Sequence, residues 1–146
     1  MKLTHTQVLK APREKVFAAL TDPETLKACI EGCESLVPAG PDAFDAVLNV
    51  GLAGIKGGYK GSLKIQERRP PESLTLAIEG KGLPGFVRGS ARVRLAEKDG
   101  GTELTGEGEA AVGGLIAAVG SRFVEAAAKK MLADFLGRLA ARIGVE

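Results

Sequence analysis

The sequence has few of the residues on which metal centres, nucleophilic catalysis and base stacking depend. Its 146 residues include no Trp, one Tyr, one His and two Cys. The single histidine, His5, has no second His or Cys at ligand spacing, so no metal site is expected. Cys29 and Cys33 are four residues apart without a His beside them, and we interpret them as packed thiols. Because no nucleophile–histidine motif or phosphate-binding loop is present either, we expect no catalytic residue and no cofactor.

Strong charge and long apolar runs are lacking as well. The formal net charge is +2 and aromatic residues make up 4% of the chain. Nucleic-acid binding calls for a clustered basic face or exposed aromatic side chains, so we expect no nucleic-acid partner. No run of about 18 apolar residues predicts a membrane span, and no secretory signal follows Met1. We expect a cytoplasmic protein with reduced cysteines, and peripheral contact with the inner face of the membrane stays open.

Most of the chain shows the alternation of apolar and polar residues that is typical of β-strands. A first strand is predicted at residues 3–9, followed by a short helix from residue 11 and another at 22–28. The alternation then runs from residue 36 to residue 112, with strong turn signals at 69–72 and 98–101. This pattern predicts antiparallel strands with one covered face and one solvated face.

The last part of the chain predicts one long helix over residues 115–142. Apolar residues recur there at spacings of seven and four, and the stripe consists of Ile116, Phe123, Ala127, Met131, Phe135 and Leu139. Such a helix would be ~40 Å long, enough to cross a whole sheet. The order of elements therefore predicts an α+β fold, in which a curved antiparallel sheet of about six to seven strands wraps around the terminal helix. We expect a single domain over residues 1–146.

The covered face of the predicted sheet is rich in small residues. Its inward positions include Gly61, Gly80, Gly82, Gly89, Ala91, Gly106, Gly108 and Ala110. Two interpretations are open: the helix backbone packs closely onto these glycines, or the small residues leave a cavity between sheet and helix. An apolar ligand in such a cavity would be held by shape and burial. The candidate ligand-binding residues are Phe17, Leu52, Ile55, Tyr59, Phe86, Phe123, Ala127 and Met131.

Three glycine-rich apolar segments, 52–58, 83–86 and 112–116, are predicted at the same end of the sheet. Surface turns are normally polar, so these segments form a mouth to the cavity, a docking surface for a membrane or partner, or an inward-folded cap. The candidate mouth and docking residues are Ala53, Gly54, Lys56, Leu83, Pro84, Arg88, Leu115, Ile116 and Arg122. The cations among them are either solvated and paired, or they meet a quinone carbonyl, a lipid phosphate or an acidic partner.

Several segments resemble the CoxG family of carbon monoxide dehydrogenase subunits, and the most specific is residues 50–61, VGLAGIKGGYKG. The other similar segments are residues 22–24, 29–33, 67–71, 80–82, 85–89 and 113–122. The resemblance implies the helix-grip fold of the START-like, Bet v 1-like and polyketide cyclase-like (SRPBCC) proteins, which hold an apolar ligand between a curved sheet and a long C-terminal helix. It also implies association with a molybdenum-containing dehydrogenase, recruitment of that enzyme to the membrane and handling of a quinone-type electron acceptor. Many relatives end in an apolar membrane anchor, whereas this sequence stops at Glu146, so stable anchoring is not expected.

Three functions stay open on the sequence. The favoured one is non-enzymatic binding of an apolar, quinone- or lipid-like molecule as an accessory to the dehydrogenase. The second is a ligand-free adaptor that docks the dehydrogenase at the membrane or assists its assembly. The third is a cyclase- or hydratase-type enzyme, which the shortage of acid–base residues disfavours.

Overall fold

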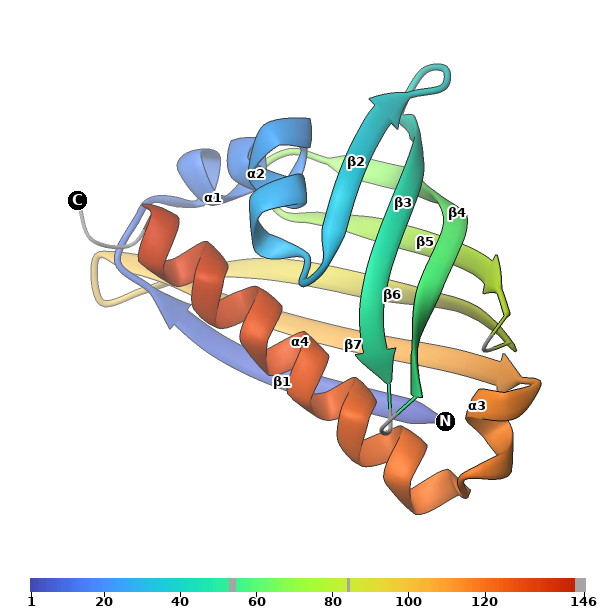
Figure 1. Ribbon diagram of the computed structural model, residues 1–146. Coiled ribbons are helices and arrows are strands. Elements are labelled where there is room, and N and C mark those ends of the chain that lie inside the picture. The colour runs from blue at the N-terminus through green and yellow to red at the C-terminus, as the bar shows by residue number, and fades with distance from the viewer. Residues whose placement is uncertain (53–54, 84, 144–146) are drawn as a thin grey trace.

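The computed structural model describes residues 1–52, 55–83 and 85–143 and contains one layer of strands covered by helices on one side (Figure 1). The elements are β1 (Lys2–Leu9), α1 (Arg13–Leu20), α2 (Pro23–Cys29), β2 (Cys33–Pro38), β3 (Ala43–Leu52), β4 (Ile55–Arg69), β5 (Ser73–Gly82), β6 (Gly85–Lys98), β7 (Gly101–Gly113), α3 (Leu115–Ala118) and α4 (Ser121–Ile143). The predicted α+β fold and its two early short helices are therefore confirmed.

The seven described strands form one antiparallel sheet in the order β1-β7-β6-β5-β4-β3-β2. Strands β2 to β7 pair with their sequence neighbours, whereas β1 pairs with β7, so that β1 and β2 are the two edges. The sheet curves around α4, which lies on its concave side, with α1 and α2 at one end and α3 at the other (Figure 1). This is the helix-grip arrangement.

The start of α2 is fixed by a side-chain cap. The Asp22 carboxylate accepts hydrogen bonds from the backbone N–H of Thr25 at 3.3 Å and from its hydroxyl at 2.7 Å. Pro23 occupies the first turn, where a missing N–H costs little. The hydrogen bond from the Thr25 hydroxyl is the main reason that the pKa of Asp22 is lowered. The local sequence thus determines where α2 begins, at the end of the sheet opposite α3.

The prediction of one continuous helix over residues 115–142 is wrong, because the chain breaks between α3 and α4. Gly120 has a φ of 106°, in the left-handed region that favours glycine. As a result α3 packs against β6 and β7, while α4 runs along β1 towards α1 and α2. The buried stripe of α4 begins at Val124, and Phe123 beside it is 68% exposed.

The apolar core consists of two separate clusters. The larger one fills the end of the sheet that α1 and α2 cover, and it includes Leu26, Leu63, Leu104 and Leu139. The smaller one lies at the other end and joins Tyr59, Ile116 and Val124. Its half-buried surroundings are Leu48, Val87, Val112 and Val119. The two clusters leave the middle of the concave face between them.

Four of the inward glycines, Gly61, Gly82, Gly89 and Gly108, allow neighbouring strands to approach each other closely, and within the described part of the chain none of the inward glycines lies close to the helix. A Cβ atom on Gly61 would overlap the carbonyl oxygen of Glu79 on β5, and one on Gly82 would overlap that of Gly58 on β4. The nearest atoms to a Cβ at the other inward glycines also belong to strands. The interpretation that the helix backbone packs onto these glycines is therefore wrong.

Candidate ligand-binding site

The concave face of the sheet is only partly covered between the two core clusters. Ile78 on β5 lies directly opposite Leu63 on β4, so both side chains point to the concave side. Leu63 is 5% exposed, whereas Ile78 is 44% exposed. Across the next strands the same row continues with Gly89 and Ala110, which have little or no side chain to fill the space. We call the partly covered surface the central zone, and on the sheet it consists of Ala46, Gly61, Ile78, Gly80, Gly89, Ala91, Gly108 and Ala110.

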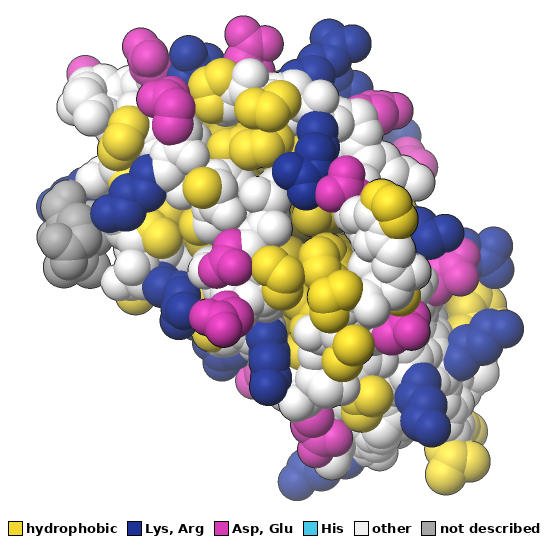
Figure 2. Space-filling model, turned by 90° about the horizontal axis from the view of Figure 1, so that it is seen from above, with side chains coloured by type: hydrophobic (Ala, Val, Ile, Leu, Met, Phe, Trp, Pro, Cys, Tyr) yellow, Lys and Arg dark blue, Asp and Glu magenta, His cyan; other side chains and the backbone are white. Residues whose placement is uncertain are grey.

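The segment of α4 between the two clusters also carries small side chains. Val124 belongs to the smaller cluster and Leu132 packs against the larger one. Between them, Ala127, Ala128 and Met131 are half-buried and belong to neither cluster. Figure 2 shows apolar side chains gathered in the middle of the face seen from above, with charged side chains around them. Apolar surface is therefore open to solvent on that side of the molecule.

Tyr59 lies at the border of the central zone and the smaller cluster. Its side chain projects to the concave face two residues before Gly61 on β4, and it is 4% exposed. Its hydroxyl has no hydrogen-bond partner among the residues that the structure describes. Burial raises the pKa of the Tyr59 phenol, so at neutral pH the hydroxyl keeps its proton and can donate it to an acceptor.

Besides Tyr59, two polar residues that the sequence interpretation missed face the concave side from the edge strand β1. His5 is in register with Gly106 and Gln7 with Leu104, so both point towards α4. The His5 ring nitrogen and the Gln7 side-chain oxygen are 3.4 Å apart, and both side chains are half-buried. The sequence could have indicated that His5 and Gln7 face inward, because they lie four and two residues before the buried Leu9 and a strand has a period of two.

Of the candidate ligand-binding residues, the structure brings Tyr59, Ala127 and Met131 to the central zone or its border. Phe17 lies in the larger core cluster, and Phe123 projects into solvent. Phe86 lies on the convex side, because its neighbour Val87 is the residue that joins the smaller cluster. The residues Leu52 and Ile55 are placed in strands, but their side chains lie outside the described part of the structure.

The candidate mouth residues that the structure describes lie at the end of the sheet that holds α3 and the smaller cluster. Leu83 is 97% exposed and Leu115 is 60% exposed, whereas Ile116 is buried. The Arg88 guanidinium lies 6.0 Å from the centre of the Phe86 ring, a distance at which a cation and an aromatic face attract each other. Lys56 and Arg122 are exposed. The positions Ala53, Gly54 and Pro84 lie outside the described residues.

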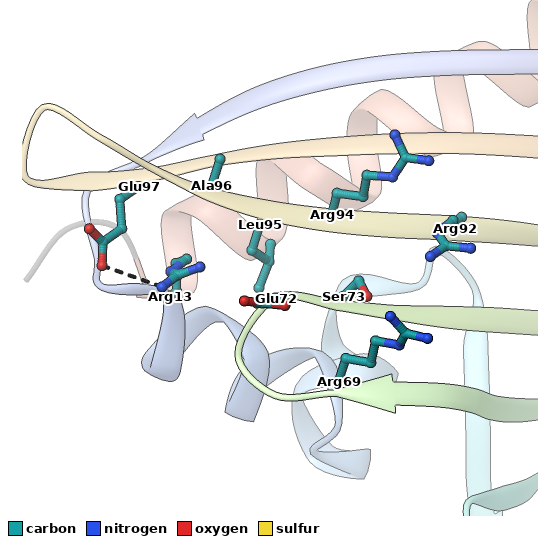
Figure 3. Close-up of a pocket in the computed structure, with 9 residues that line it drawn as sticks. All are labelled: Arg13, Arg69, Glu72, Ser73, Arg92, Arg94, Leu95, Ala96 and Glu97. Carbon is teal, nitrogen blue, oxygen red and sulfur yellow. Dashed lines mark ion pairs between the residues drawn. The ribbon is translucent and has the colours of Figure 1, made fainter.

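A hollow of about 530 Å³ lies at the other end of the sheet, but its walls are charged (Figure 3). It is lined by Arg13, Arg69, Glu72, Ser73, Arg92, Arg94, Leu95, Ala96 and Glu97. Arg13 pairs with Glu97 at 3.5 Å, and Arg92 and Arg94 pair at 3.8 and 3.7 Å with Glu67 and Glu107 outside the hollow. An apolar ligand would displace water from these charged groups without replacing the hydrogen bonds of the water, so the hollow does not suit such a ligand.

Within residues 1–52, 55–83 and 85–143, no helix is long and apolar enough to cross a membrane. The same ranges contain no group of three His, Cys, Asp or Glu side chains placed to hold a metal ion. Cys29 and Cys33 are free thiols, and burial raises the pKa of both, as expected for packed cysteines that do not serve as reactive thiolates.

The chain matches the family model of the carbon monoxide dehydrogenase subunit CoxG over residues 6–144. It belongs to the CoxG family. Among solved structures, this CoxG chain is 34% identical to a conserved protein from Geobacillus kaustophilus, over 97% of this chain and 94% of that one, with a TM-score of 0.93. It is 21% identical to a protein from Chromobacterium violaceum, over 99% and 98% of the two chains, with a TM-score of 0.72.

A di-domain ARO/CYC protein of a biosynthetic pathway also shares the fold, as expected for a polyketide cyclase-like arrangement. Its identity is 15% over all of this chain and 50% of that one, with a TM-score of 0.69. At this identity, as at the 21% of the Chromobacterium violaceum protein, the likeness concerns the fold alone. No curated protein matches the chain.

Proposed function

We propose that this CoxG-family chain binds an apolar small molecule, quinone- or lipid-like, in the central zone between the sheet and α4. In this role it is a non-enzymatic accessory to a molybdenum-containing carbon monoxide dehydrogenase. The observation that carries the proposal is the division of the core into two clusters, with Ile78 44% exposed on the concave face between them. Covering apolar surface contributes about 2.5 kcal/mol for each ~100 Å², so a ligand seated there would gain affinity from burial alone.

The polar groups at this site support binding and not acid–base chemistry. The described residues of the central zone on the sheet carry no carboxylate, and the polar side chains that border it on the strands are those of Tyr59, His5 and Gln7. Glu97 and Thr102 share the concave face but lie at its α1 end, where Glu97 pairs with Arg13 at 3.5 Å and the Thr102 hydroxyl donates to the Ala11 carbonyl at 2.7 Å. A cyclase would need a convergent set of groups with suitable pKa values. The ARO/CYC likeness does not supply one, because a shared fold does not carry an activity.

The exposed rim favours a second function, that of an adaptor without a ligand. Leu83 and Leu115 present apolar side chains to solvent at the end of the sheet where Lys56, Arg88 and Arg122 are also exposed. A surface of this kind suits docking on a membrane or on the dehydrogenase. The two functions differ in whether a small molecule accompanies the purified protein.

The test is mass spectrometry of organic extracts of the purified chain after incubation with membrane lipids and quinones. We expect close to stoichiometric recovery of one apolar species. In Ala110→Phe the added ring would lie beside Gly89, whose Cβ position is 3.2 Å from the Ala110 Cβ atom, and occupy the central zone. Recovery should fall about tenfold or more, the equivalent of a loss of about 1.4 kcal/mol.

Ala111→Phe is the matched control, because Ala111 is the next residue on β7, is exposed and lies opposite Arg88 on the convex face. This variant should bind as the unmodified protein does. Equal recovery from the two variants, or no recovery from folded and monodisperse protein, would refute binding in the central zone. Co-purification with the dehydrogenase in the absence of any extractable molecule would instead support the adaptor.

A further inference from the structure

The Tyr59 hydroxyl is an unexplained polar group in an apolar part of the molecule. The side chain is 4% exposed, and its neighbours in the smaller cluster are the aliphatic residues Ile116 and Val124. Most buried polar groups in folded proteins, roughly nine in ten, have a hydrogen-bond partner, so each exception calls for an explanation. Among the described residues none supplies an acceptor for this hydroxyl.

The position of Tyr59 connects it to the central zone. On β4 the next residue on the same face is Gly61, which pairs with Gly80 on β5. One row further along lies Ile78, opposite Leu63, and it is the exposed apolar residue of the zone. Because Gly61 and Gly80 have no side chains, only backbone separates Tyr59 from Ile78 along the concave surface. A molecule that covers Ile78 can extend over the glycines to Tyr59.

We infer that the Tyr59 hydroxyl donates a hydrogen bond to a carbonyl oxygen of the bound molecule, so that the site selects an apolar ligand with a carbonyl over a hydrocarbon of the same shape. This inference rests on the proposed function and adds a specificity-determining residue to it. The phenol is neutral and has one proton to donate, so a carbonyl, which only accepts, is the matching group. A hydrocarbon in the same place would leave the hydroxyl buried and unpaired, and the site therefore discriminates against it.

The experiment compares two probes on two proteins. The probes are menadione (2-methyl-1,4-naphthoquinone) and 2-methylnaphthalene, which has the same ring frame without carbonyls. The proteins are the unmodified chain and Tyr59→Phe, which keeps the ring and removes only the hydroxyl. Dissociation constants are measured for all four pairs, so that the intrinsic difference in hydrophobicity between the probes cancels in the double ratio.

We expect Tyr59→Phe to weaken menadione binding about tenfold and to leave 2-methylnaphthalene binding within about twofold, as for one hydrogen bond. The infrared carbonyl band of bound menadione should move to lower wavenumber in the unmodified protein and return towards its free position in the variant. A merely structural role of Tyr59 would not move that band.

The outcomes separate the inference from the proposed function. If both probes bind and the double ratio is close to one, the hydrogen bond is refuted while apolar binding stands. If the unmodified, folded protein binds neither probe up to its solubility limit, the proposed function and the inference fail together.

Discussion

Replacing Tyr59 by Phe should stabilise the ligand-free protein, an unusual sign for a change at a buried position. The substitution removes a hydroxyl that has no described partner and keeps the ring that packs against Ile116 and Val124. A buried polar group without a hydrogen-bond partner costs about 1–3 kcal/mol. Because the Tyr59 hydroxyl has no described partner, its removal leaves no other described group without a hydrogen bond. We therefore expect the free energy of unfolding to rise by about 1 kcal/mol and the melting temperature to rise by about 2–4 °C.

The assay is urea unfolding followed by circular dichroism, on protein freed of small molecules by unfolding, extraction and refolding. Both proteins should show the same dependence on urea, so that a shift in midpoint reports stability alone. A loss of about 1 kcal/mol in Tyr59→Phe would show that the hydroxyl is already hydrogen-bonded in the free protein, and would refute the reasoning. With saturating menadione the advantage of the variant should shrink, because the unmodified protein gains more from the tighter ligand.

Two other predictions concern pH and packing. Because burial raises the folded-state pKa of Tyr59 above that of the unfolded chain, its neutral form stabilises the fold fully below about pH 10 and this contribution is lost as the pH rises through the folded value. The stability advantage of Tyr59→Phe should therefore widen above about pH 10, and a constant difference in urea titrations from about pH 8 to 11 would contradict this. Leu139→Ala should cost about 2–5 kcal/mol, because Leu139 is 0% exposed, whereas Phe123→Ala should cost less than about 1 kcal/mol, because Phe123 is 68% exposed. Equal losses of stability in thermal unfolding would place Phe123 in the core.

The strands were predictable because one face of the sheet is buried and the other is wet, which imposes a period of two on the sequence. The helix break was not predicted, since a single glycine such as Gly120 is tolerated inside a helix at a cost of about 1 kcal/mol. The predicted stripe included Phe123, whereas after the break the next residue, Val124, takes the buried position on α4.

The candidate site was predicted in part, for reasons that differ between residues. Ala127 and Met131 follow helical spacing on α4, and Tyr59 follows the period of β4, so their placement was accessible from local sequence. Phe86 was not, because a shift of one residue in a strand moves a side chain to the opposite face. The inward phase of His5 was also accessible from the alternation within β1, whereas the pairing of β1 with β7 was not, because it joins segments about 100 residues apart and leaves no local signal.

That same pairing of β1 with β7 determines the order in which the chain can fold. Strands β2 to β7 are joined by short connections and can pair as soon as each hairpin is made, whereas Leu9 must meet Thr102. Closing a loop of about 90 residues costs about 2 kcal/mol more than closing one of about 10, so β1 joins the sheet late. During synthesis on the ribosome, the first strand to emerge therefore waits for the last, and β1 stays unpaired until the chain is nearly complete.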